Sequence, residues 1–243
     1  MSDRREQLLI TAIAALLEGA EYVAVGAISP IAGAAALLAQ ARSGGSMRVS
    51  MLGSARHNLF TEGGRELFDC AAQGRIDAFF LGGAQIDGSA NINLVGTGGY
   101  PQSKVRFAGS FGSAYLYFLV PRVILLQPEH STRTLVSRVD FISAPGVSPP
   151  GVYRPGGPVA LVTGRCIFSF DRVAARFRLD SVHPGETVAG IRDNTGFDFD
   201  APEHMPATPE PDAETLALLH GEVGRALAET YPEFAARVLG QAA

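Results

Sequence analysis

Residues 21–52 read EYVAVGAISPIAGAAALLAQARSGGSMRVSML, and this stretch decides the fold. The apolar run Glu21–Val25 predicts a strand, and GAISP at 26–30 predicts a turn whose proline suits the first turn of a helix. An Ala- and Leu-rich helix is expected over 31–41, followed by a short strand over 48–52. Two strands joined through one helix by short links favour a parallel pair covered by that helix.

The alternation continues on both sides of this stretch. Apolar residues at helical spacing from Leu8 to Leu17 predict a helix before the first strand. A helix over 66–72 and a strand over 77–81 are expected after the second one. The sequence therefore predicts an α/β fold built on an open, mostly parallel sheet with helices on both faces.

The second half of the chain is richer in strands. We expect these apolar runs to be strands: 92–95, 105–108, 115–120, 123–126, 139–143, 159–162, 166–170 and 176–182. They leave no room for long helices between them. A turn at 183–187 leads to a short helix ending at Asp193. Residues 201–211 carry four prolines, and Asp212 should cap a last helix over 213–229. We therefore expect one α/β domain over 1–200, followed over 201–243 by a linker and a C-terminal helix.

Composition restricts the function. With 47% apolar residues, the 243-residue chain can bury a sizeable core, and a net charge of −4 argues against nucleic-acid binding. Cys70 and Cys166 are expected to be two free, buried thiols in a reducing compartment. The apolar run at Leu8–Leu17 is about half as long as a membrane span. We expect a cytoplasmic protein with neither a membrane nor a nucleic-acid partner.

Several well-known functional motifs are absent from the sequence or matched only in part. Pro101 stands where the third glycine of a dinucleotide fingerprint would be, and there is no phosphate-binding loop. The five histidines are scattered, so no metal site is expected. AGSFG at 108–112 approaches the elbow around a nucleophilic serine, with Asp140 or Asp171 and then His183 in hydrolase order. The elbow requires a helix next, whereas SAYLYFLV at 113–120 is strand-like, so a simple turn is favoured.

The polar segment 81–101, LGGAQIDGSANINLVGTGGYP, remains as a candidate site. Gly82 and Gly83 follow the strand 77–81 at its carboxyl end, where ligands bind in open α/β sheets. The N–H groups of Gly83 and Ala84 could stabilise an oxyanion. The side chains of four nearby residues could hold the ligand or the loop: Gln85, Asp87, Asn91 and Asn93. In the alternative interpretation, the segment is a polar β-turn cluster in which Asp87 and Asn91 only bond to nearby backbone.

Three of these segments resemble a known family. GGAQID at 82–87, ANIN at 90–93 and Gly109-Ser110 resemble the β subunit of the family I coenzyme A transferases, of the glutaconate or 3-oxoacid type. HPGETV at 183–188 with NTGF at 194–197, and VGAISP at 25–30, are similar to further segments of that subunit. The resemblance covers about residues 20–199 and implies that family's open α/β, sugar-isomerase-like fold.

The resemblance also implies a chemistry. In that family a β-subunit glutamate attacks the thioester of an acyl-CoA, and CoA then passes to a carboxylic acid. The segment 82–93 would bind the acyl-CoA, and Gly26, Gly109 and Ser110 would belong to a substrate loop. A coenzyme A thioester would be a substrate, with no permanently bound cofactor. The partner would be an α-type subunit in a heterodimer or heterotetramer.

The expected glutamate is missing. The family has it just after the second strand, where RVSMLGS at 48–54 contains no carboxylate and Leu52 occupies the place. Glu62 is the nearest acid and our candidate nucleophile. In the alternative interpretation, Glu62 is an acid at the start of the following helix, where it favours the helix dipole.

Three functions remain open. We place CoA transfer first, as the activity of the broad family. The second is an acyl-CoA hydrolase or ring-cleaving enzyme, similar to the steroid-ring branch without the glutamate, with the catalytic acid or base on the α subunit. The third is a non-catalytic partner subunit or a small-acid sensor on the same fold.

Overall fold

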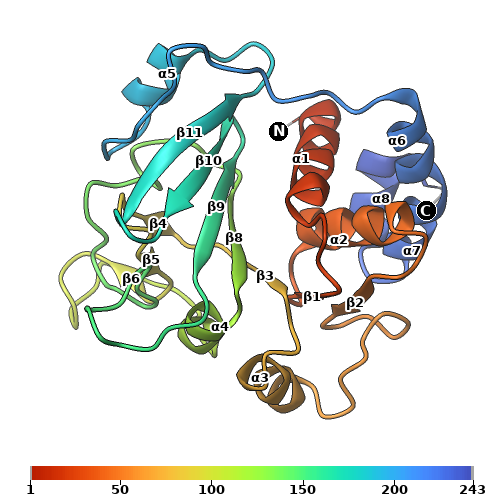
Figure 1. The fold of residues 1–243 in the computed structure, drawn as a ribbon, viewed down its shortest axis with the longest axis horizontal. Helices are drawn as coiled ribbons and strands as arrows, with labels where there is room; N and C mark the ends of the chain where they lie inside the picture. Colours follow the sequence, from red (N-terminus) through yellow and green to blue (C-terminus); the bar gives the residue numbers. More distant parts are fainter. Residues whose placement is uncertain (1, 242–243) are drawn as a thin grey trace. The chain divides into compact units, whose positions relative to one another are not determined.

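The computed structural model describes residues 2–241, which form two compact units. The first contains the residues up to Phe80 together with those from Pro209 onward, and the second contains Leu81–Thr208 (Figure 1). The C-terminal residues thus belong with the N-terminal third. The domain boundary expected at residue 200 stays a prediction.

Three parallel strands form the centre of the first unit. β1 (Tyr22–Val25) pairs along its length with β2 (Arg48–Met51), and Val23 pairs with Ala78 of β3 (Ala78–Leu81). All four residues of β1 are buried, as expected for a parallel strand covered on both faces. The predicted strands of this third of the chain are confirmed.

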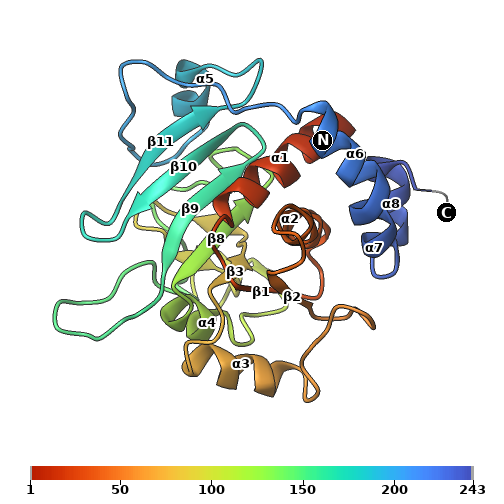
Figure 2. The same ribbon diagram turned by 45° about the vertical axis from the view of Figure 1, so that its right-hand side comes forward.

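Helices lie on both sides of these strands. α1 (Asp3–Leu16) and α2 (Pro30–Arg42) pack together, and α2 also packs on β1 and β2. α3 (Gly64–Ala72) lies on the opposite side of the strands (Figure 2). All three helices were predicted, and α2 begins with its proline in the first turn. None of the helices in the described part of the chain is both long enough and apolar enough to cross a membrane.

The C-terminal helices complete the first unit. The predicted helix over 213–229 is present as α6 (Ala213–Leu218), a π-helical turn (Leu219–Val223) and α7 (Gly224–Ala228). The Asp212 carboxylate accepts a hydrogen bond from the Thr215 N–H at 2.8 Å, which confirms the predicted cap. The last helix, α8 (Pro232–Leu239), begins at a proline and was not predicted. Contacts with α1 and α2 pack these helices into the unit.

The second unit is built on four neighbouring strands in the order β11-β10-β9-β8 (Figure 1). β8 and β9 are parallel, and β9, β10 and β11 are successively antiparallel. Their bounds are Arg122–Gln127, Pro158–Thr163, Cys166–Asp171 and Arg176–Val182. All four were predicted, as was the short helix α5 (Val188–Asp193). Among the seven longer strands, the pairs β1-β2, β1-β3 and β8-β9 are parallel, and β9-β10 and β10-β11 are antiparallel, so the mostly parallel pairing that was expected is confirmed.

Other strand predictions in this unit were wrong. Residues 115–120 lie mainly in a helix, α4 (Ser113–Leu119), and 139–143 form no strand. The runs 92–95 and 105–108 give only the short strands β5 (Ile92–Asn93) and β7 (Val105–Arg106). These strands pair with β4 (Gln85–Ile86) and β6 (Gly96–Thr97).

Residues 115–119 form a helix rather than the predicted strand because of how α4 packs. Ser113, Leu116 and Tyr117 are buried at helical spacing, while Tyr115 is exposed. Tyr117 also donates a hydrogen bond to the Ala90 carbonyl at 2.8 Å. Burial of this one helical face overrides the strand preference of the aromatic residues.

Aromatic rings fill the core of the second unit. Phe168 of β10 is fully buried, with ring centroids 5.0 Å from Phe199 and 5.8 Å from Phe177. Phe177 in turn stacks on Phe197 at 5.4 Å. The two rings after α5 thus attach that segment to β10 and β11.

Phe168→Ala should lower the free energy of unfolding by about 3–5 kcal/mol, since it leaves a cavity among these rings. Chemical denaturation monitored by circular dichroism measures the loss. Val173→Ala is the control, because Val173 is 99% exposed and its truncation should cost less than about 0.5 kcal/mol. Equal losses in both variants would contradict the ring core.

Candidate functional site

The polar segment after β3 folds on itself. β4 and β5 form a short hairpin in which Gln85 pairs with Asn93, and Ala84 N–H donates to the Asn93 carbonyl at 2.9 Å. The Ala84 amide is therefore occupied. Its expected role as an oxyanion donor stays a prediction, and that role would require this hydrogen bond to open.

Asp87 closes the turn between these two strands. One carboxylate oxygen accepts the N–H groups of Ser89 and Asn91, each at 3.1 Å. The other accepts the Asn91 side-chain amide at 3.1 Å and the Val139 N–H at 3.4 Å. The amide oxygen of Asn91 accepts the Gly146 N–H at 3.1 Å. Asp87 and Asn91 therefore join the turn to the segment 139–146.

Asn93 and Gln85 form a second set of contacts. Asn93 is fully buried, and its amide donates to Gln85 Oε1 and to the Gly96 carbonyl, both at 2.7 Å. Gln85 exchanges hydrogen bonds with Asp140, whose carboxylate also accepts the Gly98 N–H at 2.8 Å. Gln85 and Asn93 thus hold the loop, which is one of the two roles expected of their side chains.

Gly82 and Gly83, at the start of the segment, are needed for packing. A Cβ on Gly82 would lie 2.9 Å from the Leu126 carbonyl, and one on Gly83 would overlap the Ile92 side chain. The Gly83 carbonyl accepts a hydrogen bond from the Gln127 amide at 2.6 Å. The backbone of residues 82–83 is thereby fixed against β8.

Asp87→Asn should lower the free energy of unfolding by about 1–3 kcal/mol, because an amide cannot accept all four N–H groups that the carboxylate accepts. Urea denaturation measures the loss. Asp180→Asn, on the half-exposed strand β11, is a matched control expected to change stability by less than about 0.5 kcal/mol. An unchanged midpoint for Asp87→Asn would contradict the structural role.

The turn after β2 is folded around Ser54. Its buried hydroxyl oxygen accepts the N–H groups of Arg56 at 3.2 Å and His57 at 2.9 Å, and the Met51 N–H donates to the His57 carbonyl at 2.8 Å. Gly53 has a φ of +92°, a backbone conformation that favours glycine. Leu52, at the position where a nucleophile was expected, is half-buried in this turn.

A distant carboxylate reaches this turn. Glu229, just after α7, accepts the Ser54 hydroxyl at 2.6 Å and the Ala55 N–H at 2.7 Å. The Thr230 hydroxyl donates to the same carboxylate at 2.7 Å. The Ser54 and Thr230 hydrogen bonds lower the pKa of Glu229 to about 2, so it is ionised at neutral pH. Glu229 could not be predicted as a site residue, because nothing in its sequence spacing relates it to residues 54–55.

The turn after β1 is held by Tyr231, two residues after Glu229 in the connection between α7 and α8. Tyr231, the residue just before α8, donates its hydroxyl to the Ala27 carbonyl at 2.9 Å, with the Gly26 carbonyl 3.4 Å away. The same hydroxyl oxygen accepts the Ser29 N–H at 3.3 Å. Gly26 thus lies in the turn after β1, as predicted, and neighbouring Ile28 is almost fully exposed.

Glu62 lies at the surface just before α3. It forms an ion pair with Arg65, one helical turn away. The carboxylate of Glu66, the residue after Arg65, accepts the N–H groups of Thr61 at 2.6 Å and Glu62 at 3.2 Å. These contacts are typical of acids at a helix N-terminus.

Gly109 and Ser110 lie between β7 and α4, and Gly109 has a φ of +101°. A helix does follow them, so the strand-based argument against a serine elbow was wrong. His183, the histidine expected to act with that serine, is nevertheless hydrogen-bonded to other groups. The His183 ring lies 2.8 Å from the Thr208 hydroxyl and 3.0 Å from the Thr163 carbonyl, which engages both of its nitrogens.

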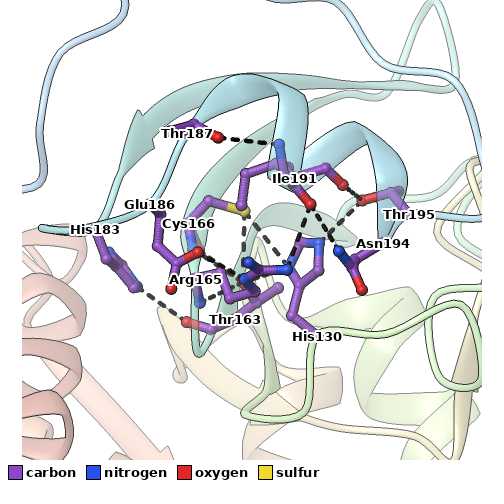
Figure 3. A network of polar contacts seen from close by, with 11 residues as sticks. His130, Thr163, Arg165, Cys166, His183, Glu186, Thr187, Ile191, Asn194 and Thr195 are labelled. Atoms are coloured by element: carbon purple, nitrogen blue, oxygen red, sulfur yellow. Dashed lines mark hydrogen bonds and ion pairs between the residues drawn. The ribbon is translucent and has the colours of Figure 1, made fainter.

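A buried polar network lies beside α5 (Figure 3). The His130 ring bonds to the hydroxyls of Thr163 at 2.9 Å and Thr195 at 3.0 Å. Cys166 Sγ lies 3.7 Å from the same ring, and burial raises the pKa of this thiol to about 12. The network ties β9 and β10 to the end of α5. Cys166, like Cys70, is a free and buried thiol, as expected.

Burial, together with the charge of Arg165, lowers the pKa of His130 from 6.5 to about 4. The native state keeps His130 neutral while the unfolded chain takes up a proton, so stability is lost as the pH falls from 6.5 towards 4. Between pH 7 and 5, the wild-type protein should lose about 2 kcal/mol more than His130→Gln. Urea denaturation at both pH values measures the difference, and parallel losses would contradict the low pKa.

No group of three His, Cys, Asp or Glu side chains within residues 2–241 is arranged to hold a metal ion. The candidate site residues fall into two parts, each described by itself: the two turns held by Glu229 and Tyr231, within the first unit, and the folded segment 82–98, within the second.

Comparison with known proteins points to one family. The family model described as coenzyme A transferase matches residues 9–194. The B-type subunit of 3-oxoadipate CoA-transferase from Pseudomonas knackmussii is 34% identical over 161 residues, which cover 64% of this chain and 62% of the relative. The B-type subunit of glutaconate CoA-transferase from Acidaminococcus fermentans is 32% identical, covering 59% and 56%.

A third relative carries a different activity in its name. The IpdB subunit of the cholesterol ring-cleaving hydrolase of Rhodococcus jostii is 30% identical, covering 64% of this chain and 62% of the relative. The matched segments thus span less than two thirds of these relatives' own length.

Solved structures share the fold. The decarboxylase AibA/AibB matches with a TM-score of 0.77 and 25% identity, covering 97% of this chain and 98% of the other. IpdAB of Rhodococcus jostii matches with a TM-score of 0.80 and 24% identity, covering 89% and 93%.

Proposed function

Because this chain belongs to the coenzyme A transferase family, we propose that it is the B-type subunit of a heteromeric enzyme that acts on an acyl-CoA thioester. The family match carries the proposal, since it includes the turns after β1 and β2 and the whole segment 82–101. The subunit names of the relatives support an α-type partner, in a heterodimer or a heterotetramer. The acyl-CoA is then a substrate, and no permanently bound cofactor is required.

CoA transfer from the acyl-CoA to a carboxylic acid is the first candidate reaction, and two relatives named as CoA-transferases support it. It requires a carboxylate that attacks the thioester and later leaves again. On this chain Glu62 is the proposed nucleophile, and its ion pair with Arg65 would have to open first.

Hydrolysis or ring cleavage of an acyl-CoA, with the acid or base on the α-type subunit, is favoured by one observation. Residues 48–61 contain no carboxylate, and Glu229, which reaches the turn after β2, already accepts hydrogen bonds at both oxygens. A group with a pKa of about 2 is also a weak base at neutral pH. The name of the IpdB relative supports the same reaction class. On this geometry we favour the second candidate.

In both reactions the segment 82–93 would be a supporting half of the site. We propose that the backbone of Gly82 and Gly83 faces the thioester. The side chains of Gln85, Asp87, Asn91 and Asn93 would keep that backbone rigid. Gly26, Gly109 and Ser110 are proposed to border the substrate.

The nucleophile can be tested on the enzyme assembled with its α-type subunit. Glutaconyl-CoA with acetate, and 3-oxoadipyl-CoA with acetate, serve as probes after the names of the relatives. If the second candidate holds, borohydride added during turnover leaves this chain unmodified, as shown by peptide mass spectrometry, and Glu62→Ala keeps the wild-type rate within twofold. With 13C-labelled acetate in the assay, the products are a free acid plus CoA or, where water cleaves the carbon–carbon bond of 3-oxoadipyl-CoA, succinate plus unlabelled acetyl-CoA, and no labelled acetyl-CoA forms.

Labelled acetyl-CoA, formed from the added acetate, together with a modified Glu62 peptide would instead establish CoA transfer. Glu203→Ala is the matched control, since it removes an exposed acid outside both parts of the candidate site. A stable monomer that binds small carboxylic acids and turns over none of the acyl-CoA probes with any partner would favour the sensor and contradict the proposed enzyme.

A further inference from the structure

The connection between α7 and α8 touches both turns of the first unit. It consists of three residues, Glu229, Thr230 and Tyr231. Glu229 bonds to the turn after β2, and Tyr231 bonds to the turn after β1. Both turns follow the carboxyl ends of parallel strands, the edge at which open α/β sheets bind ligands.

We propose that Glu229 and Tyr231 are positioning residues, which fasten the turns after β1 and β2 and so set the shape of the acyl-CoA site on this chain. The proposal rests on the proposed function, since it takes these turns to border the substrate. It assigns a functional role to the C-terminal connection.

The connection is well suited to this role because both of its ends are anchored. Leu227 before it and Ala235 after it are fully buried, and α7 and α8 pack on α2 and α1 respectively. Gly33 of α2 lies where a Cβ would be 2.8 Å from Met51 Sδ, 3.3 Å from Leu227 and 3.5 Å from the Tyr231 ring. The last residue of β2, the helix α2 and the connection therefore meet at one tightly packed point.

The bonds fix the turns at their backbone. Glu229 accepts the Ala55 N–H, and the Ser54 hydroxyl that it accepts holds the N–H groups of Arg56 and His57 in turn. Tyr231 bridges a carbonyl and an N–H of the turn after β1. Moving either side chain would therefore shift backbone at the site, and a displacement of about 1 Å in a reacting geometry can cost roughly 100-fold in rate.

Glu229 acts here by position and does not itself react. Its two oxygens accept three hydrogen bonds from Ser54, Ala55 and Thr230. A carboxylate held in this way is a poor proton acceptor and a poor nucleophile at neutral pH. Its influence on the reaction passes through the turn that contains Leu52.

Amide hydrogen exchange on the assembled enzyme tests the fastening without any substrate. In Glu229→Gln, the N–H groups of residues 55–57 should exchange at least about tenfold faster. In Tyr231→Phe, the same is expected of Ser29. Two controls, Glu233→Gln and Tyr153→Phe, make the same chemical changes at exposed positions and should leave both turns as in the wild type.

Kinetics then test the role at the site. With an acyl-CoA probe that the wild-type enzyme turns over, Glu229→Gln should lower kcat about 10- to 100-fold and change KM less than threefold. Ser54→Ala should have a similar effect. The double variant should be no slower than the more affected single variant, because both changes break the same contact.

Three outcomes overturn the proposal: unchanged exchange at residues 55–57, faster exchange with an unchanged kcat, or additive effects of Ser54→Ala and Glu229→Gln. If Glu229→Gln lowers the melting temperature and speeds exchange throughout the chain, the loss of rate reflects general destabilisation, and the positioning role also fails. If the wild-type enzyme turns over no acyl-CoA while Glu229→Gln still speeds exchange at 55–57, the proposed function fails and the fastening of the turns stands.

Discussion

The irregular half of the second unit depends on the requirement that buried polar groups find partners. Between β3 and β8 the chain forms only two-residue strands and one short helix, so few backbone groups are satisfied by regular pairing. Asp87, Asn91 and Asn93 meet the requirement, accepting or donating a set of hydrogen bonds that reaches Val139, Gly146 and Gly96. Without these side chains, the segment would bury several unpaired N–H groups, each costing about 1–3 kcal/mol. The same residues that gave the sequence its site-like composition thus make the loop rigid.

The helices and strands that depend on local sequence patterns were predicted correctly. β1, α2 and β2 follow from one strand-turn-helix pattern, and β9, β10 and β11 from apolar runs separated by turns. α4 could not be predicted, because its helical state comes from the burial of Leu116 and Tyr117 against the rest of the unit. The contact between Glu229 and Ser54 was equally hidden, since they lie 175 positions apart and neither belongs to a motif.

The candidate site was predicted in outline. The resemblance at residues 82–93 identified the family, which the match over 9–194 now shows. It also showed that the carboxylate expected after β2 is missing, and the structure adds that another carboxylate reaches that turn from the end of α7. The individual roles of Gly82, Gly83 and Glu62 depend on a bound substrate and a second subunit, and neither can be derived from one chain.

The first unit is discontinuous, and this affects how the protein is made. Residues 26–57 leave the ribosome early, while Glu229 and Tyr231, which fasten their turns, follow only after the whole second unit. At a synthesis rate of about 5–20 residues per second, the delay is roughly 10–35 s. The first three strands must wait through that time with their turns unfastened and their helical cover incomplete. The second unit is continuous in sequence and can fold meanwhile, so the part of the chain that is translated first is completed last.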